Sequence, residues 1–225
     1  MINENTLPLL SALLEKNKGK NVLLEHEIKE FLKLIGFSVP NAKFIKKGDA
    51  ISLGDLKFPV AAKISSRTIK SKSDAKGVRL GLRDLNEAKE AFDELIQIVG
   101  AEGVLIEEMA QKGLEVIVGG IIDRQFGPVV MFGLGGVFVE LFKDVAFGLA
   151  PIKKDDALRL IKQIKGYRLL EGYRGNPPVN FDALINIIVS VSEIIAANLI
   201  KEIDLNPVAL YPDGAMILDA KIEII

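Results

Sequence analysis

A predicted β-hairpin at the carboxy-terminal end of the chain constrains its fold most. Residues 203–210 and 215–222 are rich in Ile, Leu, Val and Ala, and the four residues between them read Tyr-Pro-Asp-Gly. Proline at the second position and glycine at the fourth are typical of a type I turn. Since turn geometry sets the register of a hairpin, we expect Tyr211 to pair with Gly214. Each residue before Tyr211 then pairs with the residue equally far after Gly214.

This register places two oxygen-bearing side chains opposite each other, Asn206 and Asp219. Directly opposed side chains have Cβ atoms about 4.5–5.5 Å apart. An Asn carbonyl oxygen and an Asp carboxylate at that spacing can ligate one Mg²⁺ ion through bonds of about 2.0–2.1 Å. The same register places Asp204 opposite Lys221. The alternative is that these two form a surface ion pair and Asn206 is merely exposed.

The hairpin also has an apolar face, because side chains alternate between the two faces of a strand. The residues that we expect to pack on a core are Ile203, Leu205, Leu218 and Ile222. A bulge in the turn would move the pairing by one residue and turn one strand over.

Helix-like and strand-like stretches upstream are mixed without strict alternation, which predicts an α+β (mixed α/β) fold. Predicted helices cover residues 23–35, 86–99, 154–164 and 181–200. Predicted strands cover residues 58–64, 78–82, 103–109, 114–122, 129–132 and 137–141. We place a lobe boundary before Ile106. The expected parts are an N-terminal helical segment (1–21), a first lobe (22–105) and a second lobe with the hairpin (106–225).

Composition excludes several kinds of site and partner. The chain has no cysteine and a single histidine, His26, which excludes thiolate and multi-histidine metal sites. A formal net charge of −1 argues against nucleic acid as a partner. Residues 181–200 are apolar but contain Asp182 and Glu193, so we interpret them as an amphipathic helix rather than a membrane span. We expect a soluble cytoplasmic protein, and richness in Ile, Lys and Glu favours a hot-growing source.

Two common nucleotide-binding motifs are missing from the sequence. There is no glycine-rich loop that ends in Lys-Ser or Lys-Thr. The glycine-rich turn at residues 133–136 follows a strand but precedes strand-like residues, whereas a dinucleotide fingerprint requires a helix there.

Eight blocks of sequence carry a more specific signal. They are LLEHEIKEFL (23–32), FPVAAKI (58–64), SKSDAKGV (71–78), FGPVVMFGLGGVFVE (126–140), KDVAF (143–147), EGYRG (171–175), EIDLNP (202–207) and LDAKI (218–222). Together they resemble the ATP-grasp β subunits of ADP-forming acyl-CoA synthetases. That family includes archaeal acetyl-CoA synthetase and is related to succinyl-CoA synthetase.

The resemblance implies an ATP-grasp fold of two lobes with ATP or ADP bound between them. In that family, Asn206 and Asp219 would hold Mg²⁺, and Asp204 would sit beside the transferring phosphoryl group. The implied nucleotide-binding residues are Lys63, Ser73, Lys76, Gly77, Glu107, Glu108, Met109, Ala110 and Glu115. Lys63 would reach the phosphates, residues 107–110 would read the adenine edge with their backbone, and Glu115 would bind the ribose. Without the resemblance, Lys63, Glu107 and Glu108 are ordinary exposed charges at strand ends.

Three positions depart from the family pattern. Ser71 stands where family enzymes place a histidine that can carry phosphate, so the resemblance assigns the relay position to a residue that is a poor phosphoryl carrier. Lys76 replaces a glycine of the phosphate loop and removes conformational freedom there. Gly148 replaces an arginine.

The resemblance implies an enzyme that works with an α subunit carrying the CoA-binding and ligase domains, in a hetero-oligomer for which α2β2 is one arrangement. The pair would interconvert acyl-CoA, ADP and phosphate with the free acid, ATP and CoA. Two alternatives remain open. One is a nucleotide-binding regulatory subunit without the histidine relay, and the other is a carboxylate ligase that acts alone.

Overall fold

The computed structural model describes residues 4–69, 71–136 and 143–225, and these residues form two compact units. The larger unit comprises residues up to Leu23, Ile28–Val39 and Lys112–Ile225. The smaller unit comprises Leu24–Glu27 and Pro40–Gln111. The strand predicted at residues 137–141 lies outside the described residues.

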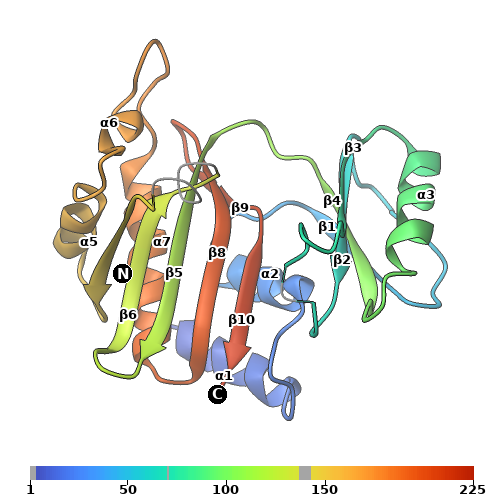
Figure 1. Ribbon diagram of the computed structural model, residues 1–225, viewed down its shortest axis with the longest axis horizontal. Coiled ribbons are helices and arrows are strands. Elements are labelled where there is room, and N and C mark those ends of the chain that lie inside the picture. The colour runs from blue at the N-terminus through green and yellow to red at the C-terminus, as the bar shows by residue number, and fades with distance from the viewer. Residues whose placement is uncertain (1–3, 70, 137–142) are drawn as a thin grey trace. The chain divides into compact units, whose positions relative to one another are not determined.

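The smaller unit is a four-stranded antiparallel sheet with one helix (Figure 1). The strand order is β1-β4-β2-β3, so β1 and β3 are the edges. The strands are β1 (Ala42–Lys46), β2 (Val60–Ser65), β3 (Val78–Leu82) and β4 (Gly103–Glu108), and the helix is α3 (Leu85–Leu95). The carboxylate of Asp84 accepts hydrogen bonds from the amides of Asn86 and Glu87 and so caps α3. Ala88, Phe92 and Leu95 of this helix pack against apolar side chains of β2 and β4.

The larger unit is built on a mainly antiparallel six-stranded sheet in the order β10-β8-β5-β6-β7, with β9 also paired to β8. Its strands are β5 (Leu114–Asp123), β6 (Gly127–Leu134), β7 (Val145–Leu149), β8 (Ile200–Leu210), β9 (Ala215–Ile217) and β10 (Ala220–Ile224). Its helices are α1 (Thr6–Lys16), α5 (Lys154–Ile161), α6 (Tyr167–Leu170) and α7 (Phe181–Ala196), together with most of α2 (Glu25–Leu34).

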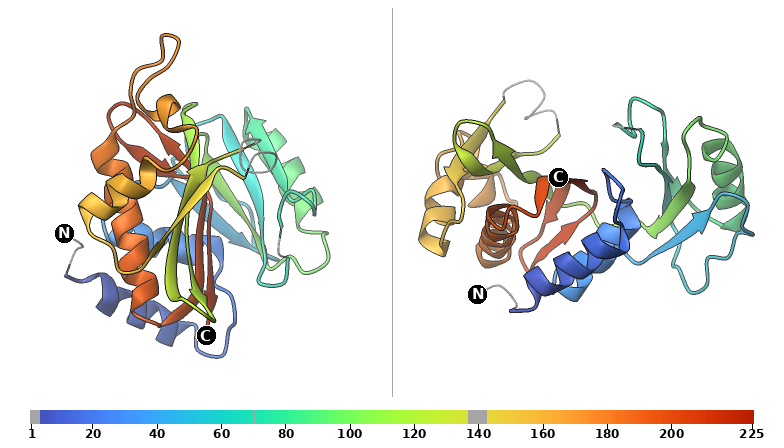
Figure 2. Two further views of the ribbon diagram at one scale, coloured as in Figure 1. Left: turned by 60° about the vertical axis from the view of Figure 1, so that its left-hand side comes forward. Right: turned by 90° about the horizontal axis from the view of Figure 1, so that it is seen from below.

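Helices α7 and α5 cover one face of the larger sheet (Figure 2). Core side chains on that face alternate along each strand, as in Val116 and Val118 of β5 or Ile203 and Leu205 of β8. Gly120 lets α7 approach β5 closely, because a Cβ atom there would lie 3.1 Å from the Cβ of Ile195. The other face of β5, β6 and β8 carries the candidate site.

The mixed α+β architecture is confirmed, but several predicted boundaries were wrong. The proposed lobe boundary before Ile106 falls inside β4, and the units divide after Gln111 instead. Helix α7 ends at Ala196 rather than at residue 200, because Ile200 is already the first residue of β8. Edge strands β1 and β7 were missed. Within the described residues, no helix combines the length and apolarity needed to cross a bilayer.

Candidate functional site

The closing hairpin has the register that its turn predicts. Leu210 pairs with Ala215 and Val208 with Ile217 on one side of the irregular middle, and Leu205 pairs with Ala220 on the other. The backbone amide of Asn206 donates to the carbonyl of Asp219 at 3.1 Å, so these two residues are direct neighbours across the hairpin. The opposition of Asn206 and Asp219 is therefore confirmed.

The middle of the hairpin carries one extra residue in each strand. Along β8, the buried positions Ile203 and Leu205 are followed by Val208 rather than by residue 207, and the pairing of β8 with β5 shifts at the same point. In the returning strand, Ile217 and Ala220 are both buried, and the two residues between them belong to neither β9 nor β10. We call this pair of interruptions, Asn206–Pro207 and Leu218–Asp219, the double bulge. Because each strand gains one residue, the register on both sides stays the same.

The double bulge corrects one packing prediction. Leu218 was expected on the core face with Ile222, but Leu218 is only partly buried and Ile217 is fully buried instead. Alternation of side chains correctly predicts that Ile222 and Ala220 both face the core. It fails before Ala220, because the strand contains an extra residue there.

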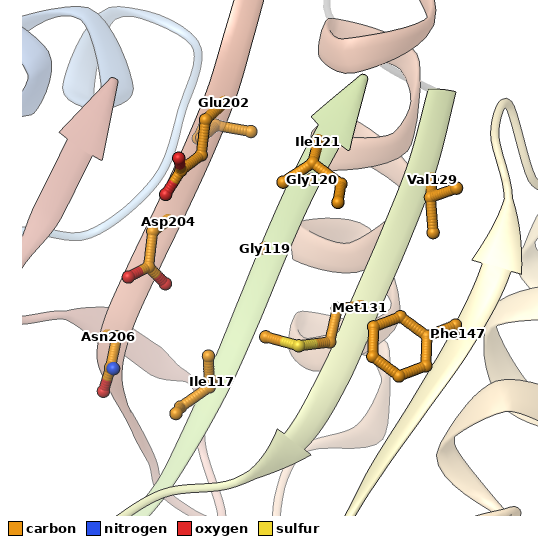
Figure 3. Close-up of a pocket in the computed structure, with 11 residues that line it drawn as sticks. Ile117, Gly119, Gly120, Ile121, Val129, Met131, Phe147, Glu202, Asp204 and Asn206 are labelled. Carbon is orange, nitrogen blue, oxygen red and sulfur yellow. The ribbon is translucent and has the colours of Figure 1, made fainter. Parts of the chain in front are cut away.

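The face of the larger sheet opposite α7 contains a pocket of about 280 Å³. Figure 3 shows Glu202, Asp204 and Asn206 in a column along β8 at one side of this pocket. Apolar side chains of the neighbouring strands, including Met131 and Phe147, line the other side. Gly119 contributes no side chain, which leaves space beside Asp204. An acidic and amide-bearing rim next to an apolar floor suits a metal-bound, partly apolar ligand.

Lys221 forms ion pairs beside the column of Glu202, Asp204 and Asn206. The Nζ atom of Lys221 lies 2.6 Å from Oε1 of Glu223 and 3.8 Å from Oε1 of Glu202. Partial burial opposes protonation, but the hydrogen bond to Glu223 and the nearby carboxylates raise the pKa of Lys221 overall. The hydrogen bond from Lys221 lowers the pKa of Glu223. Lys221 does lie opposite Asp204, as the register predicts, but it also binds these two glutamates.

The smaller unit contains a buried charge cluster that we call the lysine–glutamate cluster: Lys63, Glu107, Glu25 and Lys72. Nζ of Lys63 lies 2.5 Å from Oε1 of Glu107 and 3.4 Å from Oε1 of Glu25. Nζ of Lys72 lies 3.0 Å from Oε2 of Glu25. Lys63, Glu107 and Glu25 are each at most 7% exposed, so they are not exposed charges at strand ends.

Sequence reasoning missed Glu25, which joins Lys63 of β2 to Lys72 of the following loop. Its position at the start of an amphipathic helix gave no sign of burial, because acidic residues are common in the first turn of helices. His26 beside it stacks on Phe44 with ring centroids 3.9 Å apart, in keeping with a packing role.

The loop at residues 71–77 closes tightly before β3. The amide of Asp74 donates to Oγ of Ser71 at 3.2 Å, and the amide of Lys76 donates to the carbonyl of Ser73 at 2.9 Å. Lys76 has a φ of 52°, the left-handed conformation that glycine adopts at no steric cost. A Cβ atom on Gly77 would lie 2.3 Å from Cγ2 of Ile64, so only glycine fits there without movement of β2.

The predicted hinge residues are partly engaged within the chain. The amide of Glu108 donates to Asn41 and that of Met109 donates to Pro59, at 2.9 and 3.0 Å. The carboxylate of Glu108 accepts from the amide of Lys57 and the side chain of Asn41. Two of the four predicted hinge amides, those of Glu108 and Met109, are thus engaged within the chain. Glu115 is exposed in β5 and alternation places it on the pocket face, two residues from Ile117.

The structure therefore gathers the predicted residues into two groups. Asp204, Asn206 and Asp219, with Glu115 nearby, belong to the larger unit, and the other predicted site residues belong to the smaller unit. Among the described residues, no three His, Cys, Asp or Glu side chains converge as a metal cage. Two protein oxygen ligands suit Mg²⁺, which usually keeps water and substrate phosphates as its other ligands.

Comparison with known proteins gives consistent matches. The sequence profile of the ATP-grasp domain family matches residues 15–224. Subunit beta of acetate–CoA ligase (ADP-forming) I of Pyrococcus furiosus is 48% identical over 221 residues, which cover 93% of this chain and 95% of that protein. Acetate–CoA ligase (ADP-forming) II of Archaeoglobus fulgidus is 41% identical, and the match covers 90% of this chain but only 30% of that longer protein.

A solved structure has the same architecture over the whole chain. It is the dinucleotide-forming acetyl-coenzyme A synthetase 1 of Ca. Korarchaeum cryptofilum, in complex with coenzyme A, Ca-AMPCP and HgCl⁺. The TM-score is 0.85 at 39% sequence identity, and the match covers 99% of this chain and 100% of the other.

Proposed function

We propose that this chain, which belongs to the ATP-grasp domain family, is the nucleotide-binding β subunit of an ADP-forming acyl-CoA synthetase. The enzyme would be of the acetate–CoA ligase type. The reaction converts acyl-CoA, ADP and phosphate into the free acid, ATP and CoA. The observation that carries the proposal is the in-register opposition of Asn206 and Asp219, with Asp204 on the same side of the sheet.

The donor set fits magnesium. Asn206 supplies an amide oxygen and Asp219 a carboxylate, which are the hard oxygen ligands that Mg²⁺ prefers. When bound, the ion neutralises charge on the nucleotide phosphates. Asp204, two residues from Asn206 on β8, faces the pocket and is placed to orient the phosphoryl acceptor. Catalysis of this type depends mainly on position and charge, so few side chains are required.

In the smaller unit, the lysine–glutamate cluster supplies cations for the phosphates. Lys63 and Lys72 are both held by carboxylates, which fixes their ammonium groups in position. The loop with Ser73, Lys76 and Gly77 presents backbone amides, and Ala110 reads the adenine edge because Glu108 and Met109 already donate within the chain. Glu115 binds the ribose.

The partner is an α subunit that carries the CoA site. Similar proteins are named beta subunits, and the Archaeoglobus fulgidus relative is a longer chain of which this sequence matches 30%. That length is expected if α and β parts are fused there. We propose that the two subunits form a hetero-oligomer of the α2β2 type in the cytoplasm.

Ser71 favours a second candidate function, a nucleotide-binding regulatory subunit. A serine cannot form the phosphohistidine that the family position implies, and its Oγ already accepts a hydrogen bond from Asp74. Tight Mg-ATP binding by the reconstituted αβ complex without formation of ATP from acetyl-CoA, ADP and phosphate would favour this candidate.

Calorimetry with ATP, with and without Mg²⁺, tests the metal site directly. We expect Asn206→Ala and Asp219→Ala each to weaken magnesium-dependent binding at least about 10-fold, because each removes one of two protein ligands. Asp213→Ala, which changes an exposed residue in the turn of the same hairpin, is the control and should bind as the wild type does. Unchanged binding in both ligand variants would refute the assignment.

A further inference from the structure

Helix α2 carries a buried lysine, Lys29, to which the proposed function assigns no role. Lys29 is 4% exposed and, with Leu218, belongs to the larger unit. Its Nζ atom donates a hydrogen bond of 2.7 Å to the main-chain carbonyl oxygen of Leu218, which lies 189 residues further along the chain. Since an ammonium group is costly to bury without hydrogen-bond acceptors, a contact of this kind indicates a specific structural task.

Pro207 faces Leu218 across the hairpin and cannot donate a main-chain hydrogen bond to it. The amide of Leu218 donates to the carbonyl of Pro207 at 3.0 Å, but Pro207 has no N–H with which to return a bond. Leu218 lies in the double bulge, between the end of β9 and the start of β10. Lys29 supplies, from a helix, a donor that Pro207 cannot provide.

This contact bears directly on Asp219. The carbonyl of Leu218 and the amide of Asp219 belong to one peptide group, which is planar. A hydrogen bond that fixes the carbonyl therefore fixes the peptide plane. The next peptide is held as well, because the amide of Asn206 donates to the carbonyl of Asp219 at 3.1 Å. With both flanking peptides held, the direction of the Cα–Cβ bond of Asp219 is set, although this residue lies outside regular strand.

We propose that Lys29 is a positioning residue for the metal ligand Asp219 and acts through the carbonyl of Leu218. The inference rests on the proposed function, since it requires that Asp219 bind the metal. The inference also predicts an effect of Lys29 on metal affinity that is opposite in sign to its electrostatic effect. A cation near a divalent metal ion repels it, so a purely electrostatic Lys29 would weaken metal binding, whereas a positioning Lys29 strengthens it.

The test compares Lys29→Met with wild type by calorimetry of ATP binding, with and without Mg²⁺. Met has similar length but no donor. Loss of a residue that orients a metal ligand typically lowers metal affinity about 10–100-fold, and we expect a magnesium-dependent loss in this range. Binding of ATP without metal should stay within about 2-fold, which also shows that the variant is folded. Lys33→Met changes an exposed lysine on the same helix and should have no effect.

A second variant and a spectroscopic readout keep the test decisive. Lys29→Gln replaces the ammonium by a shorter neutral amide and should cause the same loss if Lys29→Met does not fold. Electron paramagnetic resonance of bound Mn²⁺ should show a broadened signal in both variants. If Asp219→Ala loses magnesium dependence but the Lys29 variants bind Mg-ATP as tightly as wild type, or more tightly, the inference fails alone. If none of these variants changes magnesium dependence, the metal site itself is wrong and the inference fails with it.

Discussion

The lysine–glutamate cluster predicts that Lys63 contributes to stability, in addition to the nucleotide-binding role proposed above. At an effective dielectric constant of about 20, the attraction of unit charges at 2.5 Å, the distance from Nζ to Glu107, is roughly 7 kcal/mol before desolvation. Removal of one partner of a buried pair typically costs about 3–5 kcal/mol, because the other charge is left uncompensated. In Lys63→Met, Glu25 keeps Lys72 at 3.0 Å, so Glu107 is the charge that loses its partner. We therefore expect Lys63→Met to destabilise the smaller unit by about 3–5 kcal/mol.

Hydrogen exchange of the amides of β2 and β4 measures this loss locally, since both strands belong to the smaller unit. The double variant Lys63→Met with Glu107→Met replaces the buried pair by apolar side chains. It should recover most of the lost stability, because replacement of a whole buried pair is often close to neutral. It should bind ATP more weakly than wild type, because the proposed phosphate ligand Lys63 is absent. Lys201→Met is the matched control. It breaks a pair with Glu223 in which the lysine side chain is 65% exposed, and should cost less than about 1 kcal/mol.

A cost below about 1 kcal/mol for Lys63→Met, together with no recovery in the double variant, would refute this account. Such a result would mean that the pair of Lys63 and Glu107 contributes little to stability. A double variant that regained both stability and ATP binding would show instead that Lys63 does not contact the phosphates.

Three further predictions concern the loop, the phosphate position and the hairpin. Gly77→Ala should cost about 1–3 kcal/mol and weaken ATP binding, because its Cβ would lie 2.3 Å from Ile64; unchanged denaturant unfolding would contradict this. After incubation with Mg-ATP, mass spectrometry under phosphoramidate-preserving conditions should find no phosphohistidine in the wild-type loop and should find one only in Ser71→His; phosphate on His26 would count against its packing role. Because the pKa of Glu223 is lowered by Lys221, the stability advantage of wild type over Glu223→Gln should be complete above the ordinary glutamate pKa and vanish as pH falls through the lowered value, measured by urea denaturation between pH 7 and 3; a constant difference would exclude this linkage.

Features that depend on residues close together in the sequence, such as the hairpin register and the bounds of β3, could be predicted from the sequence. The Tyr-Pro-Asp-Gly turn fixes the hairpin register, and that register alone placed Asn206 opposite Asp219. β3 was predicted with the observed bounds, because turn residues flank a short strand. The strands missed, β1 and β7, are both sheet edges. Two lysines break up the apolar pattern of β1, whereas β7 is a five-residue apolar run without alternation, which periodicity cannot assign.

Long-range pairing of charges could not be predicted from one sequence. Glu25 and Lys63 are 38 residues apart, and nothing near either residue marks it as buried. The double bulge left a readable trace, because the spacing from Leu205 to Val208 is three residues instead of two and Pro207 lies within it. An interpretation that allowed for proline in a strand would have placed the interruption there.

Because of the double bulge, the hairpin can change in length without a change in which side chains face the core. Loss of Pro207 alone would keep Leu205 and Val208 facing inward but would leave the extra residue of the returning strand without a counterpart in β8, whereas loss of Pro207 and Leu218 together would keep the two strands paired one to one. Insertions and deletions in this hairpin should therefore occur in matched pairs across the two strands. The shortened hairpin would lack the carbonyl that Lys29 binds, so we expect a variant of this length to depend less on Mg²⁺ for ATP binding.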